Sequence, residues 1–141
     1  MNLKNSFNNL KNLRILLVED DALIRDSLGM VFKSRGCHFI ASESAEKALP
    51  VLDSDGFDII ISDFKLPGTD GLSFLKPAAA ISPQSIKILI TAFHEKEIVA
   101  EAFRCGIHDF IEKPFSSRKL IDDASQLTAG HQPASISGAC A

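Results

Sequence analysis

Three short apolar runs constrain most strongly what this chain can fold into. They are ILLV at residues 15–18, DIII at residues 58–61 and KILI at residues 87–90. None of them alternates between apolar and polar residues, as a strand with one solvent-facing side would. Continuous apolar strands of this kind are typical of parallel sheets that are covered on both faces. We therefore expect a parallel sheet with helices on both sides.

Helical patterns alternate with the strand patterns along the chain. The first helical pattern covers residues 21–36, and Gly36 ends it. Two further strand patterns and four further helical patterns follow in alternation, the strands at 38–42 and 107–112 and the helices at 44–56, 71–82, 95–106 and 116–127. The alternation predicts an α/β fold, a doubly wound five-stranded parallel sheet flanked by five helices. Pro77 lies inside the third helical pattern and should kink, shorten or delay that helix.

The length and composition fit one domain with a segment on either side. The chain has 141 residues, of which 45% are hydrophobic and 23% are charged, and this is typical of a single globular domain. Residues 1–12 are polar and rich in Asn, so we expect a flexible lead-in there. Residues 128–141 are small and polar, which predicts a disordered tail or a linker stub. The folded domain should cover residues 13–127.

Charge and cysteine usage exclude several classes of protein. The net charge of -3 argues against direct nucleic-acid binding, which needs a basic face. No apolar run approaches the ~20 residues of a membrane span. Cys37, Cys105 and Cys140 are far apart and form no CxxC pair, so a zinc site or a disulfide framework is not expected. Free thiols fit a reducing compartment, and we expect a cytoplasmic protein.

Charged and hydroxyl side chains stand where the predicted strands end. Along the chain these side chains are Glu19 and Asp20, Asp63, Thr91 and Lys113. In an open parallel sheet, ligands bind outside the carboxyl ends of the strands. We therefore expect these side chains to meet at one edge of the sheet, although they are far apart in the sequence.

This set of side chains suits phosphoryl chemistry. Glu19, Asp20 and Asp63 offer the carboxylate oxygens that Mg²⁺ prefers as ligands. An aspartate is already deprotonated at neutral pH and can act as a nucleophile that forms an aspartyl-phosphate. Lys113 would then neutralise one phosphoryl oxygen, and the hydroxyl of Thr91 would donate a hydrogen bond to another.

Four segments in order resemble the landmarks of response-regulator receiver domains, the CheY-like family of two-component signalling. They are ILLVEDD, IISDFKLPGTDG, ILITAF and DFIEKPF, each at the end of a predicted strand. The resemblance covers residues 13–127 and implies a flavodoxin-like strand order of 2-1-3-4-5. It implies a sensor histidine kinase or a phosphotransfer protein as donor, an unidentified protein target downstream, and possible homodimers. It implies no enzymatic activity beyond self-catalysed phosphoacceptance and slow autodephosphorylation.

The resemblance also assigns roles around the metal. Asp63 matches the phospho-acceptor of the family. Glu19 and Asp20 match the acidic pair that holds Mg²⁺ together with Asp63. Lys65 would offer its backbone carbonyl to the same ion. Asp21, the next acid along, is expected to cap the first helix.

The remaining landmark residues concern the phosphoryl group and the switch. Thr91 and Lys113 would contact the phosphoryl group, and a cis bond would join Lys113 to Pro114. Phe110 matches the aromatic switch position, which is Tyr in many relatives, so any switching hydrogen bond from a hydroxyl on that ring is absent here. Phe110 could also simply pack in the core, as aromatic residues in strands commonly do.

Two other functions stay open. A phosphorylation-independent pseudo-receiver would bind partners through the same fold without taking a phosphoryl group. An aspartate-nucleophile phosphatase is the other alternative. In its commonest form a second Asp stands two residues after the first, and here that position holds Lys65. A flavin-binding module is disfavoured because the acidic loop EDDAL at residues 19–23 would repel a phosphate.

Overall fold

A parallel sheet forms the centre of the molecule. The computed structural model describes residues 10–54, 56–92 and 96–129, and within them the sheet has five strands in the order β2-β1-β3-β4-β5. The strands are β1 (Arg14–Val18), β2 (His38–Ser42), β3 (Ile59–Asp63), β4 (Ile86–Thr91) and β5 (Asp109–Glu112). All neighbouring pairs are parallel, so the predicted strand order is confirmed.

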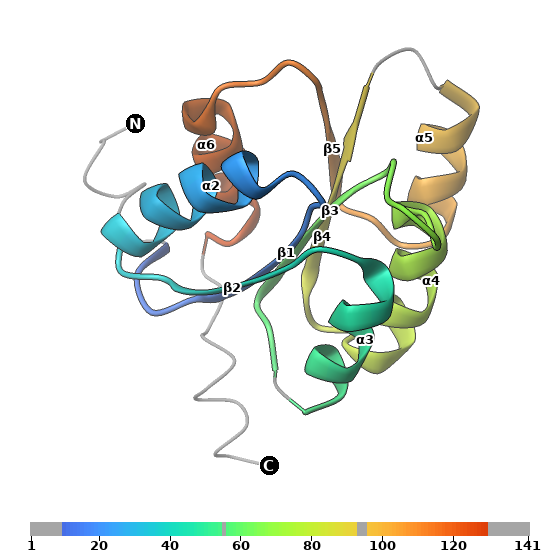
Figure 1. Ribbon diagram of the computed structural model, residues 1–141, viewed down its shortest axis with the longest axis horizontal. Helices are drawn as coiled ribbons and strands as arrows, with labels where there is room; N and C mark the ends of the chain where they lie inside the picture. Colours follow the sequence, from blue (N-terminus) through green and yellow to red (C-terminus); the bar gives the residue numbers. More distant parts are fainter. Residues whose placement is uncertain (1–9, 55, 93–95, 130–141) are drawn as a thin grey trace.

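Helices cover both faces of this sheet. They are α2 (Ala22–Ser34), α3 (Ala45–Ser54), α4 (Gly71–Ile81), α5 (Lys96–Arg104) and α6 (Ser117–Leu127). Figure 1 shows α2 and α6 on one face, and α3, α4 and α5 on the other. The expected doubly wound α/β fold is therefore confirmed. No helix in the described part of the chain combines the length and apolar character needed to cross a membrane.

Burial on both faces explains the apolar runs. Every residue of β3 and β4 is buried. Ile59 and Ile61 face the core cluster beneath α2 and α6, whereas Ile60 faces the cluster beneath α3, α4 and α5. Each fully buried side chain of this size contributes about 1.5–3 kcal/mol from its removal from water. The strands β3 and β4, which end at Asp63 and Thr91, are therefore buried along their whole length.

Side-chain caps set the starts of the helices next to the sheet edge. Asp21 accepts hydrogen bonds from the backbone N–H groups of Leu23 at 2.9 Å and Ile24 at 3.3 Å, as expected. Asp70 caps α4 in the same way and accepts from the N–H of Ser73 at 2.7 Å. These caps fix where the chain leaves the loops after β1 and β3.

Pro77 does not interrupt its helix. The helix α4 begins at Gly71 and continues through Pro77 to Ile81, so the expected delay or early stop is wrong. Pro77 is exposed, while Phe74 and Ala78 on the same helix are completely buried. Packing of the buried face against the sheet outweighs the single backbone hydrogen bond that a proline removes.

The packed region extends slightly beyond the expected boundaries. Leu10 is completely buried, and its carbonyl accepts a hydrogen bond from the thiol of Cys37 at 3.2 Å. At the other end, Thr128 is buried and its hydroxyl donates to the carbonyl of Ala124 at 2.6 Å. Leu10 and Thr128 therefore pack with the domain, although we expected them in the flexible lead-in at 1–12 and the tail at 128–141. The remainders of these two segments, 1–9 and 130–141 with Cys140, lie outside the described residues.

Candidate functional site

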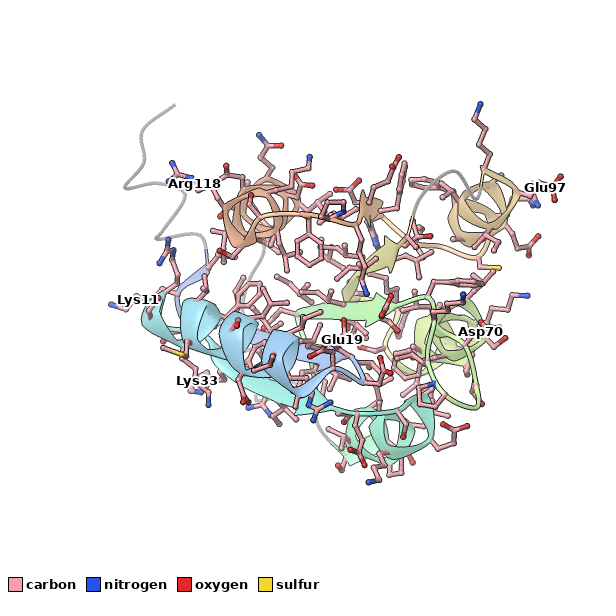
Figure 2. All side chains as sticks on the ribbon, turned by 45° about the horizontal axis from the view of Figure 1, so that its top comes forward. Lys11, Glu19, Lys33, Asp70, Glu97 and Arg118 are labelled. Atoms are coloured by element: carbon pink, nitrogen blue, oxygen red, sulfur yellow. The ribbon has the colours of Figure 1, made fainter. Side chains whose placement is uncertain are left out.

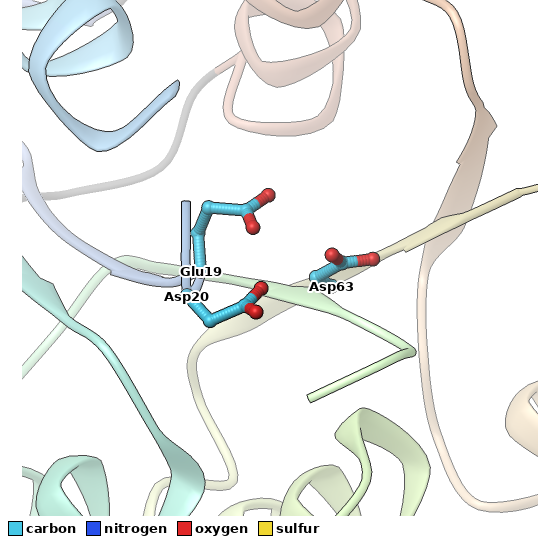
Figure 3. A group of neighbouring side chains, drawn as sticks. All are labelled: Glu19, Asp20 and Asp63. Atoms are coloured by element: carbon cyan, nitrogen blue, oxygen red, sulfur yellow. The ribbon is translucent and has the colours of Figure 1, made fainter. Parts of the chain in front are cut away.

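Acidic side chains gather at the carboxyl ends of the central strands. Glu19 follows β1, and Asp63 is the last residue of the neighbouring strand β3. One carboxylate oxygen each from Glu19, Asp20 and Asp63 lies within 4.8 Å of the other two. Figure 3 shows the three carboxyl groups turned toward a common space. The expectation that these acids meet at one edge of the sheet therefore agrees with their positions.

Lys113 joins this cluster from the loop after β5. Its ammonium group donates a hydrogen bond to Asp63 Oδ2 at 2.8 Å and lies 3.7 Å from Glu19 Oε1. The Lys113–Pro114 peptide bond is cis, as the resemblance implied. Burial disfavours the charged ammonium, but its hydrogen bond to Asp63 and the nearby negative charges outweigh this effect and raise the pKa of Lys113. Lys113 therefore brings a positive charge to the site at neutral pH.

Glu19 is the most deeply buried acid of the cluster. It is 1% exposed, and Figure 2 shows it in the middle of the molecule, whereas labelled residues such as Lys33 lie at the periphery. Burial raises the pKa of Glu19 to about 7; Asp63 and Asp20 add to this, while the N–H of Asp21 and the charge of Lys113 oppose it. Its Oε2 accepts from the N–H of Asp21 at 3.1 Å. Its Oε1 is buried and accepts no hydrogen bond from the described residues.

The donor set fits a hard divalent cation. Among the described residues, three carboxylates lie around the ammonium group of Lys113, so their negative charge exceeds its single positive charge. The oxygen Oε1 of Glu19, buried without a hydrogen bond in the described residues, would gain a partner from a bound cation. Asp20 is exposed and opens the cluster to solvent. Oxygen-only ligands of this kind, with room for water, suit Mg²⁺.

Gly71 allows the chain to turn tightly behind Asp63. A Cβ atom at Gly71 would lie 2.0 Å from the carbonyl oxygen of Asp63, far inside any allowed contact. The N–H of Gly71 donates to the carbonyl of Phe64 at 2.8 Å. Lys65 lies in the same loop and is exposed. The position of Asp63 therefore depends on a glycine at the start of α4.

Thr91 and Phe110 lie on β4 and β5, the two strands that follow β3 in the strand order of the sheet. Thr91 ends β4, is 1% exposed and accepts a hydrogen bond through its carbonyl from the N–H of Lys113 at 2.8 Å. Phe110 on β5 is half-buried. Its ring meets the ring of Phe103 edge to face, with 6.1 Å between the centroids. Phe103 is 45% exposed, so Phe110 lies between the core and a solvent-facing ring.

The sequence comparison decides the family. Residues 15–125 match the sequence model described as the response regulator receiver domain. The chain belongs to this family. Receiver domains are signalling modules of two-component systems, in which histidine kinases phosphorylate them, and they bind Mg²⁺ at an acidic pocket. The resemblance found in the four sequence segments is therefore confirmed.

Curated relatives are longer proteins than this receiver domain. It is 38% identical over 122 residues to the response regulator protein FleR of Pseudomonas aeruginosa, and the match covers 86% of this chain and 26% of FleR. It is 32% identical over 110 residues to the C4-dicarboxylate transport transcriptional regulatory protein DctD of Rhizobium meliloti, covering 78% of this chain and 24% of DctD. The receiver domain thus spans about a quarter of the length of each.

Solved receiver domains have the same fold over their whole length. A CheY-like receiver domain protein from Methanospirillum hungatei JF-1 has a TM-score of 0.81 at 26% identity, covering 85% of this chain and 96% of that one. The receiver domain of the Francisella response regulator 1452 has a TM-score of 0.78 at 26% identity, covering 86% and 100%. The fold described above is therefore that of complete receiver domains.

Two supporting contacts were missed from the sequence. Arg25 on α2 donates through its guanidinium to the carbonyl of Glu19 at 2.7 Å. Glu46 on α3 accepts two hydrogen bonds from Thr69 in the loop after β3. No motif marks these residues, because each contact joins segments that only the tertiary fold brings together.

Replacing Glu19 tests the buried charge directly. With its pKa raised from 4.5 to about 7, Glu19 contributes stability that is fully present below the lower value and lost as the pH rises through the higher one. We therefore expect Glu19→Gln to raise the melting temperature of the metal-free protein at about pH 8 and to have little effect at about pH 5. Thermal melts in a chelator at the two pH values measure this.

A matched control is Glu43→Gln, which removes an exposed carboxylate that pairs with Lys47. This variant should give no pH-dependent gain in melting temperature. A Glu19→Gln protein that is less stable than wild type at about pH 8, or equally shifted at both pH values, would contradict the charge burial described here.

Proposed function

We propose that this receiver domain takes a phosphoryl group on Asp63 from a sensor histidine kinase or a phosphotransfer protein, with Mg²⁺, and then switches a protein-interaction face. The observation that carries the proposal is the setting of Asp63. Asp63 is 4% exposed, and its carboxylate accepts a hydrogen bond from the Lys113 ammonium at 2.8 Å and lies beside those of Glu19 and Asp20. A nucleophilic carboxylate thus lies next to a positively charged group and to further oxygen atoms that can bind a metal ion.

The transfer step follows from these groups. A carboxylate oxygen of Asp63 attacks the phosphorus of a phosphohistidine, the new O–P bond forms, and the P–N bond breaks. The electron pair of the P–N bond leaves with the imidazole nitrogen. Lys113 neutralises a phosphoryl oxygen, and the hydroxyl of Thr91 donates a hydrogen bond to another. A carboxylate nucleophile has no proton to give up when the O–P bond forms, so the step as written needs no general base.

Glu19, Asp20, Asp63 and the backbone carbonyl of Lys65 would hold the Mg²⁺ ion. When bound, the ion supplies positive charge beside the phosphoryl oxygens, which carry the negative charge of the transition state. The support is the oxygen-only donor set and the buried Glu19 Oε1, which accepts no hydrogen bond from the described residues.

The switch would run from Asp63 through β4 to β5. An aspartyl-phosphate adds charge next to the end of β4, where Thr91 lies. In our proposal Thr91 moves toward the phosphoryl group and Phe110 rotates into the space it leaves, which alters the contact with the exposed ring of Phe103. This would bias a two-state equilibrium of α5 and β5.

The wider role follows the family. We propose a cytoplasmic protein that contacts its kinase and an unidentified protein target, with no membrane or direct nucleic-acid contact by this chain and with possible homodimers. The relatives FleR and DctD are a response regulator protein and a transcriptional regulatory protein, and comparable output by this chain is part of the proposal only. Activity on small molecules is disfavoured, because Lys65 stands where a phosphatase would carry its second aspartate.

Phosphorylation by a small donor tests the acceptor. Incubation with phosphoramidate and Mg²⁺ should add one phosphoryl group to the wild type in an intact-mass measurement, because the pocket itself supplies the catalytic groups. Asp63→Asn should add none. The matched control Asp53→Asn changes an exposed aspartate on α3 and should be phosphorylated like the wild type.

Two results would count against the proposal. Phosphorylation of Asp63→Asn to the same extent as wild type would place the acceptor elsewhere. No added mass in the wild type with any of several phosphodonors would favour the alternative, a pseudo-receiver that binds partners without phosphorylation.

Backbone NMR spectra test the switch. Adding Mg²⁺ and beryllofluoride, a phosphoryl mimic, should shift amide signals around Asp63 and also those of α5 and β5 near Phe103 and Phe110. In Thr91→Val, which keeps the side-chain shape but lacks the hydroxyl, the distant shifts should shrink while those around Asp63 persist. Wild-type shifts confined to the surroundings of Asp63 would refute this route.

A further inference from the structure

A carboxylate from α3 holds the loop that follows Asp63. Glu46 Oε2 accepts a hydrogen bond from the backbone N–H of Thr69 at 3.0 Å and another from the Thr69 hydroxyl at 2.8 Å. Both donors belong to one residue of the loop between β3 and α4, and both meet a single oxygen. Hydrogen bonds to a charged acceptor are stronger than those between neutral groups.

The loop backbone leaves space for this carboxylate. Gly68 has a φ of +77°, and a Cβ atom there would lie 2.7 Å from Glu46 Oε2. The glycine therefore serves two purposes, a left-handed backbone and a close approach by Glu46. The hydrogen bonds from Thr69 also lower the pKa of Glu46, so the acceptor is ionised at neutral pH.

The far end of the loop is fixed independently. Gly71 packs against the carbonyl of Asp63 and donates its N–H to Phe64, and Asp70 caps α4. The stretch at residues 65–68 lies between Asp63 and the residue that Glu46 holds, and it includes the Lys65 carbonyl of the proposed metal site. The two hydrogen bonds from Thr69 to Glu46, which we call the tether, therefore limit where the Lys65 carbonyl can lie.

We propose that Glu46 is a positioning residue of the acceptor site. By holding Thr69 from α3, it keeps the loop in the conformation in which the Lys65 carbonyl can face a cation bound by Glu19, Asp20 and Asp63. Without the tether, the bound cation must itself order the loop, and its affinity falls. This inference rests on the function proposed above, because it concerns the same metal site.

Glu46→Gln tests the tether by separating metal affinity from the rate at saturation. Removing a contact that holds a metal ligand in position typically changes metal affinity by roughly tenfold or more. We expect the Mg²⁺ concentration at half-maximal phosphorylation to rise by about tenfold, while the rate at saturating Mg²⁺ stays near that of wild type. Titration calorimetry with Mg²⁺ alone should report the same loss of affinity without any phosphodonor.

Partner variants and a control sharpen the test. Thr69→Val removes the hydroxyl donor and should weaken Mg²⁺ binding in the same direction, whereas Thr69→Ser keeps the hydroxyl and should restore it. The double variant Glu46→Gln/Thr69→Val should lose less binding free energy for Mg²⁺ than the sum of the losses in the two single variants. Glu43→Gln removes the same charge from a residue that pairs with Lys47, and its Mg²⁺ affinity should match wild type.

Hydrogen exchange gives a readout without metal. In the metal-free protein, the amide of Thr69 should exchange faster in Glu46→Gln than in wild type, because its acceptor is weakened. A Mg²⁺ affinity of Glu46→Gln within about twofold of wild type would overturn the inference, as would an equal loss in Glu43→Gln, which would indicate bulk charge alone.

The two proposals fail in different ways. If the wild type is phosphorylated, Asp63→Asn is not, and Glu46→Gln binds Mg²⁺ like wild type, only the inference about Glu46 is wrong. If the wild type binds no Mg²⁺ and takes up no phosphoryl group, the proposed function is wrong and the inference falls with it.

Discussion

This receiver domain depends on one constraint: it must hold several negatively charged carboxylates together at the edge of a buried sheet. Glu19 and Asp63 are almost completely buried and lie together with Asp20, and one ammonium group, that of Lys113, lies among them. Carboxylates that share a site repel one another, and here burial, with Asp63 and Asp20 adding to it, raises the pKa of Glu19. The fold thus holds a locally unfavourable concentration of negative charge, which a bound cation would neutralise.

The surrounding structure holds this arrangement in place. The two core clusters bury β1, β3 and β4 from both faces, so the carboxyl ends of these strands have fixed relative positions. Around them, Gly71 permits the tight turn behind Asp63, and Glu46 ties the following loop to α3. Packing of the central strands, together with a few polar contacts in the loops around the site, can therefore offset the repulsion between the carboxylates. Asp20 is exposed, so the cluster is open to solvent on its side.

Much of this could be predicted from the sequence, because continuous apolar runs identify central parallel strands, and residues after such strands meet at one edge. The gathering of Glu19, Asp63 and Lys113 follows from that rule alone. Other features depend on tertiary packing that no local pattern encodes. The burial of Leu10 in a polar segment and the Glu46–Thr69 contact are of this kind, and so is the unbroken helix at Pro77.

The most direct test of the account is the melting temperature as a function of Mg²⁺ concentration, compared between the wild type and Asp20→Asn. A cation that binds only the folded cluster stabilises it by mass action, so the wild type should melt at progressively higher temperature as Mg²⁺ is added. Asp20→Asn should start higher in a chelator, because one repelling charge is gone, and should respond weakly to Mg²⁺. A wild-type melting temperature that is independent of Mg²⁺ would contradict the account.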